Sequence, residues 1–291
     1  MGSDEATGQA NVSRVLVVGA GAMGSGIAQV IAESGMEVVL TDVDTPSLER
    51  GMAGIAARWD KAVASGKRDA ATVDGFKSQL QSGDLSAARN VDLVIEAIVE
   101  RLAAKSTLFS ELGQVAPDHA ILASNTSSIS VTALATASGR PAQFVGLHFF
   151  NPVPVLPLVE IVRGLQTSPE TVDTAERFVN RLGKTPVIVQ DSPGFVANRI
   201  LLPMINEAVY TLQDGIADAA GIDAVMKLGA AHPMGPLALA DLIGLDVCLD
   251  ILETLHRDFG DDKYRPAPLL RRMVAAGRLG RKSGQGFHVY S

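Results

Sequence analysis

The chain has 291 residues, of which 47% are hydrophobic, and its 32 acidic and 25 basic residues give a formal net charge of −7. This content can bury the core of a soluble globular protein with one or two domains, and the acidic balance argues against binding nucleic acid or an anionic membrane surface. The single cysteine, Cys248, excludes an internal disulfide and a thiolate metal cluster, so no metal site is expected.

The N-terminal residues 1–13 are mostly small and polar, and we expect them to be disordered. The chain has no apolar run of the ~18 residues that a membrane span needs. It also lacks the basic and then apolar segment of a signal peptide. We therefore expect a cytoplasmic protein with a small-molecule partner.

The first folded elements form a βαβ unit. Residues 14–18 are a β-branched apolar run that predicts a strand, and residues 23–34 carry apolar side chains at helical spacing. A second short strand, 38–40, leads to Asp42. Further strands are predicted at 92–97, 120–124, 144–148, 158–162 and 186–189, separated by helices such as 100–115 and 169–182.

This alternation of strands and helices predicts an α/β domain over residues 14–190, with a doubly wound, mostly parallel sheet and a helical arm near 46–80. From residue 191 onward the pattern is helical, so a smaller all-helical domain is expected over 191–291. Its predicted helices are 193–213, 222–228, 237–244 and 268–276.

Residues 19–24 read Gly-Ala-Gly-Ala-Met-Gly, the G-x-G-x-x-G pattern, between the first strand and the first helix. Gly19 permits the sharp turn, Gly21 lets the backbone approach a pyrophosphate, and Gly24 lets the helix pack on the sheet. The N–H groups of the helix N-terminus, which includes Ala22 and Met23, can bind the phosphates.

Asp42 ends the second predicted strand, where its carboxylate can accept hydrogen bonds from the adenosine ribose hydroxyls and would repel a 2′-phosphate. Three glycines alone could be turn chemistry, but with strand, helix and terminal acid in register they predict a Rossmann-type domain that binds NAD.

Two polar residues interrupt apolar strands further along the chain. His148 ends the predicted strand 144–148, and Glu160 lies within the predicted strand 158–162. Taken singly, the histidine could be a satisfied core or surface residue, and the glutamate could point to solvent.

Five motifs follow one another in the sequence: Gly19–Gly24, Glu96-Ala-Ile-Val-Glu100, Ser124-Asn-Thr-Ser-Ser128, His148-Phe-Phe-Asn-Pro152 and Pro193-Gly-Phe-Val-Ala-Asn-Arg199. In this order they resemble the short-chain L-3-hydroxyacyl-CoA dehydrogenase family over residues 14–290. The resemblance implies reversible NAD-dependent oxidation of an L-3-hydroxyacyl-CoA to the 3-ketoacyl-CoA in fatty acid metabolism. It favours short chains, such as 3-hydroxybutyryl-CoA and acetoacetyl-CoA.

The resemblance also implies roles for individual residues. His148 would be the catalytic base, Glu160 would fix its tautomer, and Ser127 and Asn198 would donate hydrogen bonds to the reacting oxygen of the substrate. The residues implied to bind the cofactor are Glu100, Lys105 and Asn125, and Asn151 is implied to contact the substrate. The helical domain would complete the substrate cleft and form a homodimer.

Simpler interpretations stay open for several of these residues. Ser127 could cap a helix that begins near Val131, and Asn198 could be a surface amide. Glu100 and Lys105 could form an exposed helix pair. A basic stretch at 50–68 includes Arg58 and Lys61, which could contact the phosphates of CoA or could form a solvated helix face.

Three other functions compete with this hypothesis. A dehydrogenase on the same fold could oxidise a free hydroxy or sugar acid, as the gulonate dehydrogenases do with much the same dyad. A non-catalytic NAD-binding protein would not need the set of His148, Glu160, Ser127 and Asn198. A 3-hydroxyisobutyrate-type dehydrogenase would be expected to use a lysine base.

Overall fold

The computed structural model describes residues 12–290, and the chain divides into two compact units, with Asp191 the last residue of the first and Ser192 the first residue of the second. Of the segment 1–13 that was predicted to be disordered, residues 1–11 lie outside the described residues. Val12, in contrast, is buried, and Ser13 donates hydrogen bonds from its backbone N–H and its hydroxyl to Asp92. Ordered contacts therefore begin before the first strand.

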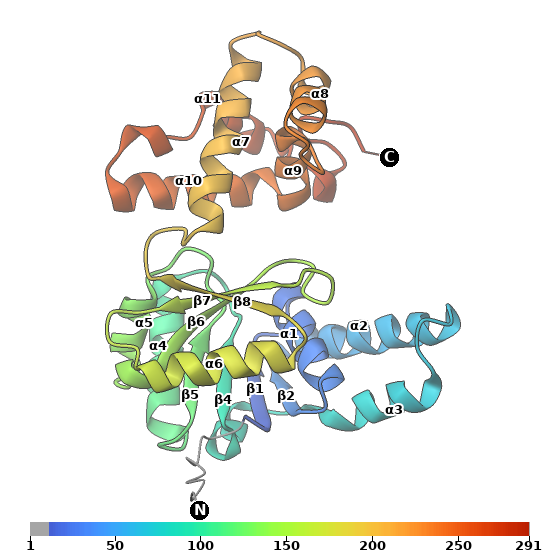
Figure 1. Ribbon diagram of the computed structural model, residues 1–291, viewed down its shortest axis with the longest axis vertical. Helices are drawn as coiled ribbons and strands as arrows, with labels where there is room; N and C mark the ends of the chain where they lie inside the picture. Colours follow the sequence, from blue (N-terminus) through green and yellow to red (C-terminus); the bar gives the residue numbers. More distant parts are fainter. Residues whose placement is uncertain (1–11, 291) are drawn as a thin grey trace, which may run out of the picture. The chain divides into compact units, whose positions relative to one another are not determined.

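The described part of the first unit contains an eight-stranded sheet with the order β3-β2-β1-β4-β5-β6-β7-β8 (Figure 1). All neighbouring strands run parallel except β6 and β7, which are antiparallel. The strands are β1 (Arg14–Val18), β2 (Glu37–Thr41), β3 (Leu80–Ser82), β4 (Leu93–Glu96), β5 (Ile121–Ser124), β6 (Phe144–Phe149), β7 (Leu158–Arg163) and β8 (Thr185–Gln190). The predicted doubly wound, mostly parallel α/β sheet is confirmed.

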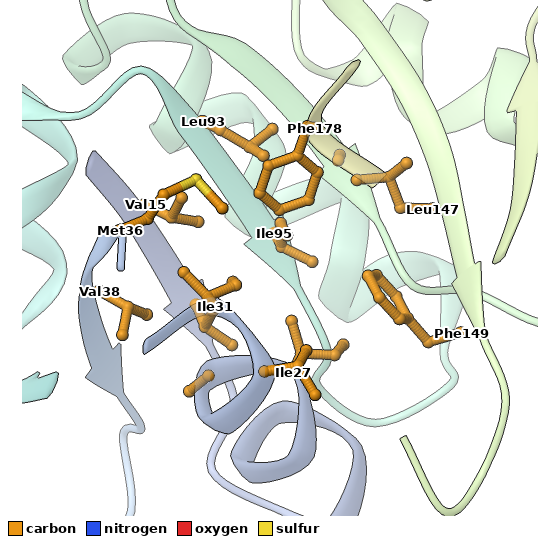
Figure 2. Close-up of a cluster of buried hydrophobic side chains, with 14 of the residues drawn as sticks. Val15, Ile27, Ile31, Met36, Val38, Leu93, Ile95, Leu147, Phe149 and Phe178 are labelled. Atoms are coloured by element: carbon orange, nitrogen blue, oxygen red, sulfur yellow. The ribbon is translucent and has the colours of Figure 1, made fainter. Parts of the chain in front are cut away.

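Helices cover both faces of this sheet. On one face α1 (Ala22–Glu33) and α6 (Pro169–Arg181) share a buried cluster with strand residues such as Val15 and Ile95 (Figure 2). On the other face lie α4 (Leu102–Val115) and α5 (Val131–Ala137), and Phe109 of α4 makes an edge-on ring contact with Phe144 of β6. Burial on both faces explains why the central strands read as continuous apolar runs.

The helical arm predicted near 46–80 consists of α2 (Thr45–Ala64) and α3 (Ala70–Gln79). Side chains that precede each helix cap it, because Asp44 accepts a hydrogen bond from the N–H of Ser47 and Asp69 accepts one from the N–H of Thr72. Strand β3, which follows the arm directly, was missed in the sequence because three residues are too few to show a period.

The second unit is helical, as predicted, with a buried core that includes Leu202, Leu237 and Leu252. Its helices are α7 (Ala197–Gln213), α8 (Ala219–Gly229), α9 (Pro236–Ile243), α10 (Leu245–Phe259) and α11 (Pro268–Ala275). The predicted start of α7 at residue 193 is wrong, because Gly194 and Phe195 have φ values of 72° and 51° and form a turn instead. Helix α10 was missed.

Two buried carboxylates hold the C-terminal tail of the second unit. Asp241 of α9 accepts hydrogen bonds of 2.9 Å from the N–H groups of Phe287 and His288 and from the hydroxyl of Tyr290. Asp223 of α8 lies 2.8 Å from Nε2 of His288. The tail is therefore attached to the core of this unit by side-chain acceptors rather than by a strand.

Within residues 12–290, every helix is too short or too polar to cross a membrane.

Candidate active site

The carboxyl ends of β1 and β4 meet where the strand order reverses, which is where doubly wound sheets bind their ligands. The glycine loop 19–24 lies there. Gly19 has φ of 107°, and a Cβ at this residue would lie 2.5 Å from the carbonyl oxygen of Ala97, which follows β4. A Cβ at Gly24 would lie 1.7 Å from the carbonyl oxygen of Gly19. Any side chain at either position would force the loop and the helix apart.

Gly21 differs from these two glycines, because a Cβ built on it would meet no atom within 4 Å. Gly21 precedes α1, which has no side-chain cap among the described residues. The N–H groups of the first turn, at Ala22 and Met23, therefore remain available for hydrogen bonds to an anion. An open glycine in front of an uncapped helix N-terminus fits the pyrophosphate of a dinucleotide.

The Asp42 carboxylate lies beside this loop. Its Oδ2 accepts a hydrogen bond of 2.7 Å from the N–H of Ala20, and its Oδ1 accepts one of 2.9 Å from the N–H of Asp44. These two bonds hold the carboxylate at the end of β2, next to the phosphate loop. This is the geometry needed to receive ribose hydroxyls.

His148 and Glu160 form a buried pair. They lie directly opposite each other in the antiparallel β6–β7 ladder, and His148 Nδ1 is 2.7 Å from Glu160 Oε2. The side chains are 7% and 3% exposed, and the ring of Phe150 packs 4.5 Å from the imidazole, between ring centres. If Nδ1 carries the proton toward Glu160, Nε2 is the nitrogen that can accept a proton from a ligand.

Glu100 organises the segment 126–128 that follows β5. Its Oε1 accepts hydrogen bonds of 2.5 Å from the Thr126 hydroxyl and 2.8 Å from the N–H of Ser127, and a longer one from the N–H of Ser128. Burial by itself would raise the pKa of Glu100, but the Lys105 ammonium and these hydrogen bonds lower it below its usual value. Glu100 is therefore ionised at neutral pH.

Lys105 is buried, with its side chain 1% exposed, so the alternative of an exposed Glu100–Lys105 helix pair is wrong. Its Nζ lies 2.5 Å from Glu96 Oε1 and 3.1 Å from Glu100 Oε2. Glu96 was not singled out from the sequence as a site residue. The sequence feature that could have identified Glu96 is an acidic residue at the end of an apolar strand.

The three asparagines in the predicted site have different surroundings. Asn125 accepts, through Oδ1, a hydrogen bond of 2.9 Å from the N–H of Phe149, which links it to the residue after His148. Asn151 is exposed in the β6–β7 loop. Asn198 lies in the first turn of α7 in the second unit. The alternative of Ser127 as the α5 cap is wrong, because Ser130 caps that helix.

The β6–β7 loop is held in place by Lys184, which was not among the predicted site residues. The ammonium of Lys184 donates hydrogen bonds of 2.6 Å and 2.8 Å to the carbonyl oxygens of Val153 and Leu156. Burial lowers the pKa of Lys184, although the Glu33 carboxylate acts against this. Lys184 directly precedes β8, so it fixes the loop between His148 and Glu160 to the neighbouring strand.

Arg58 and Lys61 both lie in α2. The Nε of Arg58 donates a hydrogen bond of 2.5 Å to the Gln29 side chain of α1, so part of this guanidinium is already engaged within the protein. Lys61 is exposed. Within residues 12–290 we find no group of three or more His, Cys, Asp or Glu side chains that could hold a metal ion.

The glycine loop, the uncapped helix and the Asp42 carboxylate define the first unit as an NAD-binding domain of a dehydrogenase. Comparison with known families agrees. A family model described as the NAD binding domain of 3-hydroxyacyl-CoA dehydrogenase matches residues 14–192, and the model of the C-terminal domain of the same family matches residues 194–290.

Similar proteins cover almost the whole chain. A probable 3-hydroxybutyryl-CoA dehydrogenase of Deinococcus radiodurans is 55% identical over 94% of this chain and 99% of its own length. A 3-hydroxybutyryl-CoA dehydrogenase of Bradyrhizobium diazoefficiens is 48% identical over 96% of each chain. The crystal structure of an (S)-3-hydroxybutyryl-CoA dehydrogenase from Ralstonia eutropha superposes with a TM-score of 0.93 at 46% identity, covering 97% of this chain and 100% of the other.

The chain therefore belongs to the 3-hydroxyacyl-CoA dehydrogenase family. It is an NAD-dependent enzyme of this family, so the predicted cofactor and class of reaction are confirmed.

Proposed function

We propose that the enzyme interconverts short-chain L-3-hydroxyacyl-CoA and 3-ketoacyl-CoA thioesters, with 3-hydroxybutyryl-CoA and acetoacetyl-CoA as its preferred pair. The observation that carries the proposal is the buried pair formed by His148 and Glu160, whose Nδ1 and Oε2 atoms lie 2.7 Å apart. The names of the relatives support the short acyl chain.

In the oxidation, neutral His148 takes the proton of the 3-hydroxyl through Nε2 while the C3 hydrogen leaves as a hydride. Bound NAD supplies the hydride acceptor. In the reduction, imidazolium returns the proton to the oxygen at C3. Glu160 acts through His148, because its carboxylate fixes the tautomer and stabilises the charged imidazolium.

The remaining site residues hold the reactants in this proposal. Ser127 and Asn198 donate hydrogen bonds to the reacting oxygen as charge develops on it, and Asn151 contacts the acyl part of the substrate. The cofactor phosphates are held by the loop 19–24 and its ribose units by Asp42, Glu100, Lys105 and Asn125.

Arg58 and Lys61 are proposed as contacts for the CoA phosphates. The engagement of Arg58 with Gln29 makes Lys61 the better candidate, because its ammonium lies on the exposed side of α2. The proposal also includes a cytoplasmic location and a homodimer formed through the helical unit. Dimerisation is tested by light scattering of the purified protein, and a monomer at all concentrations would contradict it.

The experiment that tests the function is NADH oxidation with acetoacetyl-CoA, compared with free acetoacetate and with NADPH in place of NADH. Rapid turnover only with the thioester and NADH is the expected result, because a CoA-dependent site draws binding energy from the carrier. Turnover of free acids, with L-gulonate tested next, and none with the thioester would overturn the proposal in favour of a sugar acid substrate. Activity with a series of longer 3-ketoacyl-CoA thioesters tests the chain length.

A further inference from the structure

The most deeply buried carboxylate near the cofactor loop is that of Glu96, which is 0% exposed at the carboxyl end of β4. A charge buried this deeply destabilises the fold unless partners compensate it. Glu96 has three such partners. Its Oε1 accepts hydrogen bonds from the Lys105 ammonium at 2.5 Å and from the N–H of Ile98 at 2.7 Å, and its Oε2 accepts one from the Ser124 hydroxyl at 2.6 Å.

These contacts connect β4 to two other elements. Lys105 comes from α4, and its ammonium also reaches Glu100 Oε2 at 3.1 Å, so two carboxylates share one cation. Ser124 ends β5, and its oxygen accepts a hydrogen bond of 3.2 Å from the N–H of Thr126. Glu96 thus holds α4 and the end of β5 in one position relative to β4.

The segment 124–128 is attached to this cluster at both ends. Ser124 attaches its beginning to Glu96, and Glu100 accepts hydrogen bonds from its end, at Thr126 and Ser127. The N–H of Asn125 donates to the backbone carbonyl of Glu96 at 2.8 Å. The segment carries Asn125 and Ser127, two residues of the proposed site.

The position of this charge argues against a role in stability alone. The other β4 residues, Leu93 to Ile95, are apolar and buried, and an apolar side chain at position 96 would stabilise a sheet interior at least as well. Glu96 instead lies at the strand end that borders the glycine loop, where a Cβ on Gly19 would contact the Ala97 carbonyl. The polar cluster here places the Lys105 ammonium and the Ser124 and Thr126 hydroxyls beside this loop.

We propose that Glu96 is a positioning residue of the cofactor site: it fixes the Lys105 ammonium and, through Ser124, the segment 124–128 for contact with the nicotinamide half of NAD. This inference rests on the proposed function for the roles of Lys105 and Asn125. Glu96 itself acts through its neighbours and does not touch the reacting atoms.

The test measures NADH binding to the Glu96→Gln variant. The signal is the energy transfer from protein fluorescence to the bound cofactor. The amide is nearly the same size, but it loses the charge that holds Lys105 and turns an N–H donor toward one of its present donors. We expect the Kd for NADH to rise about tenfold, the effect of losing one charge-assisted hydrogen bond. At saturating NADH the kcat should fall by a smaller factor, about twofold to threefold. Glu96→Asp, which keeps the charge on a shorter arm, should give an intermediate Kd.

The matched control is Asp92→Asn, because Asp92 precedes the same strand at its opposite end and accepts hydrogen bonds from Ser13 and Arg14. This variant should lower the melting temperature and leave the Kd for NADH unchanged. If Glu96→Gln also leaves the Kd unchanged, or if both variants raise it equally, the proposal is overturned.

Ser124→Ala decides the question if Glu96→Gln does not fold, because it keeps the Glu96 charge and removes the hydroxyl that links Glu96 to the segment 124–128, together with the hydrogen bond that this hydroxyl accepts from the N–H of Thr126. A rise of about threefold in the Kd supports the proposal, and an unchanged Kd overturns it. The titration needs no acyl substrate. A wild-type enzyme that is inactive with acetoacetyl-CoA would therefore refute the proposed function and leave the comparison of Kd values interpretable.

Discussion

The two units of the chain both bury carboxylates, but they surround them with different partners. In the first unit, the buried Glu96 and the partly exposed Glu100 share the Lys105 ammonium and accept hydrogen bonds from side-chain hydroxyls in addition to backbone N–H groups. In the second unit, Asp241 and Asp223 accept hydrogen bonds mainly from backbone N–H groups, at residues 287–288 and 237–238.

These two kinds of partner correspond to two structural roles of a carboxylate. A carboxylate that binds other side chains fixes where those side chains point, which is what a ligand site needs. A carboxylate that binds backbone N–H groups fixes the path of the chain, as a helix cap or a turn does. Substitutions at the Glu96–Glu100 cluster of the first unit should therefore affect cofactor binding, and substitutions of Asp223 and Asp241 in the second unit should affect stability.

The largest effect is expected for His148→Gln in the first unit. Removing the base should lower kcat by about 10²- to 10⁴-fold, since proton transfer contributes that much, while the Kd for NADH stays nearly constant. Steady-state kinetics and NADH titration measure the two quantities. His119→Gln is the control, because His119 is 58% exposed and pairs with Asp92 at the opposite end of the sheet. A His148 variant with near wild-type kcat would refute the assignment of the base.

The next effect tests the second unit through Asp241→Asn. The amide turns two N–H donors toward a site where Phe287, His288 and Tyr290 already donate, so the free energy of unfolding of this unit should fall by about 1–3 kcal/mol. Urea denaturation followed by circular dichroism measures it. Asp258→Asn is the control, because its partner Arg257 is 69% exposed and the pair should contribute less than about 1 kcal/mol. Normal stability combined with a raised KM for NADH would contradict the comparison.

A smaller effect is expected for Asp42→Ala, which tests the choice of cofactor. Loss of the ribose acceptor should weaken NADH binding about tenfold and NADPH binding much less, because the carboxylate repels a 2′-phosphate. The ratio of the two Kd values measures this. Asp44→Ala, which removes a neighbouring exposed carboxylate that caps α2, should leave the ratio unchanged. Equal losses for both cofactors in Asp42→Ala would exclude the ribose role.

The smallest effect concerns Cys248 in the core of the second unit. Burial raises the pKa of its thiol to about 12, from 9.0, and the Asp246 and Asp241 carboxylates add to this increase. Between pH 9 and 12 the folded state therefore holds a proton that the unfolded state releases, so stability falls as the pH rises.

Ionisation of Cys248 in the unfolded state should lower the free energy of unfolding by about 1 kcal/mol between pH 8 and pH 10. Cys248→Ala should show a shallower decline by this amount, while other groups such as Tyr290 titrate in both proteins. Identical declines in the two proteins would show that the thiol is not protected.

Much of the fold follows from local patterns. The glycine loop 19–24, the strand before it and the helix after it are all encoded within about twenty consecutive residues, so their geometry could be predicted. Helix α10 could also have been found, because Leu245, Cys248 and Leu252 recur at helical spacing on its buried side. The start of α7 could not, since a proline at position 193 suits a helix and the positive φ of Phe195 depends on the surrounding turn.

The candidate site was predictable in part. His148 and Glu160 were both named from the sequence, but their register was not, because a shift of one residue between two strands turns every side chain to the other face. The antiparallel β6–β7 pairing places them directly opposite each other. Glu96 and Lys184 were not named as site residues. Both act on groups distant in sequence, the first on Lys105 and Ser124 and the second on the carbonyl groups of the β6–β7 loop.

The sequence by itself determined the elements whose cause is local: the phosphate loop, the alternation of strands and helices, and the acid that ends the second strand. Only the tertiary structure decided which polar side chains meet in the interior. Lys105 has the position of a surface helix residue, yet it is buried because the carboxylate of Glu96, from a different element, compensates its charge there. The spacing of apolar residues along a helix carries no information about a partner on a strand. The pairing of Lys105 with Glu96 therefore appears only when the elements pack together.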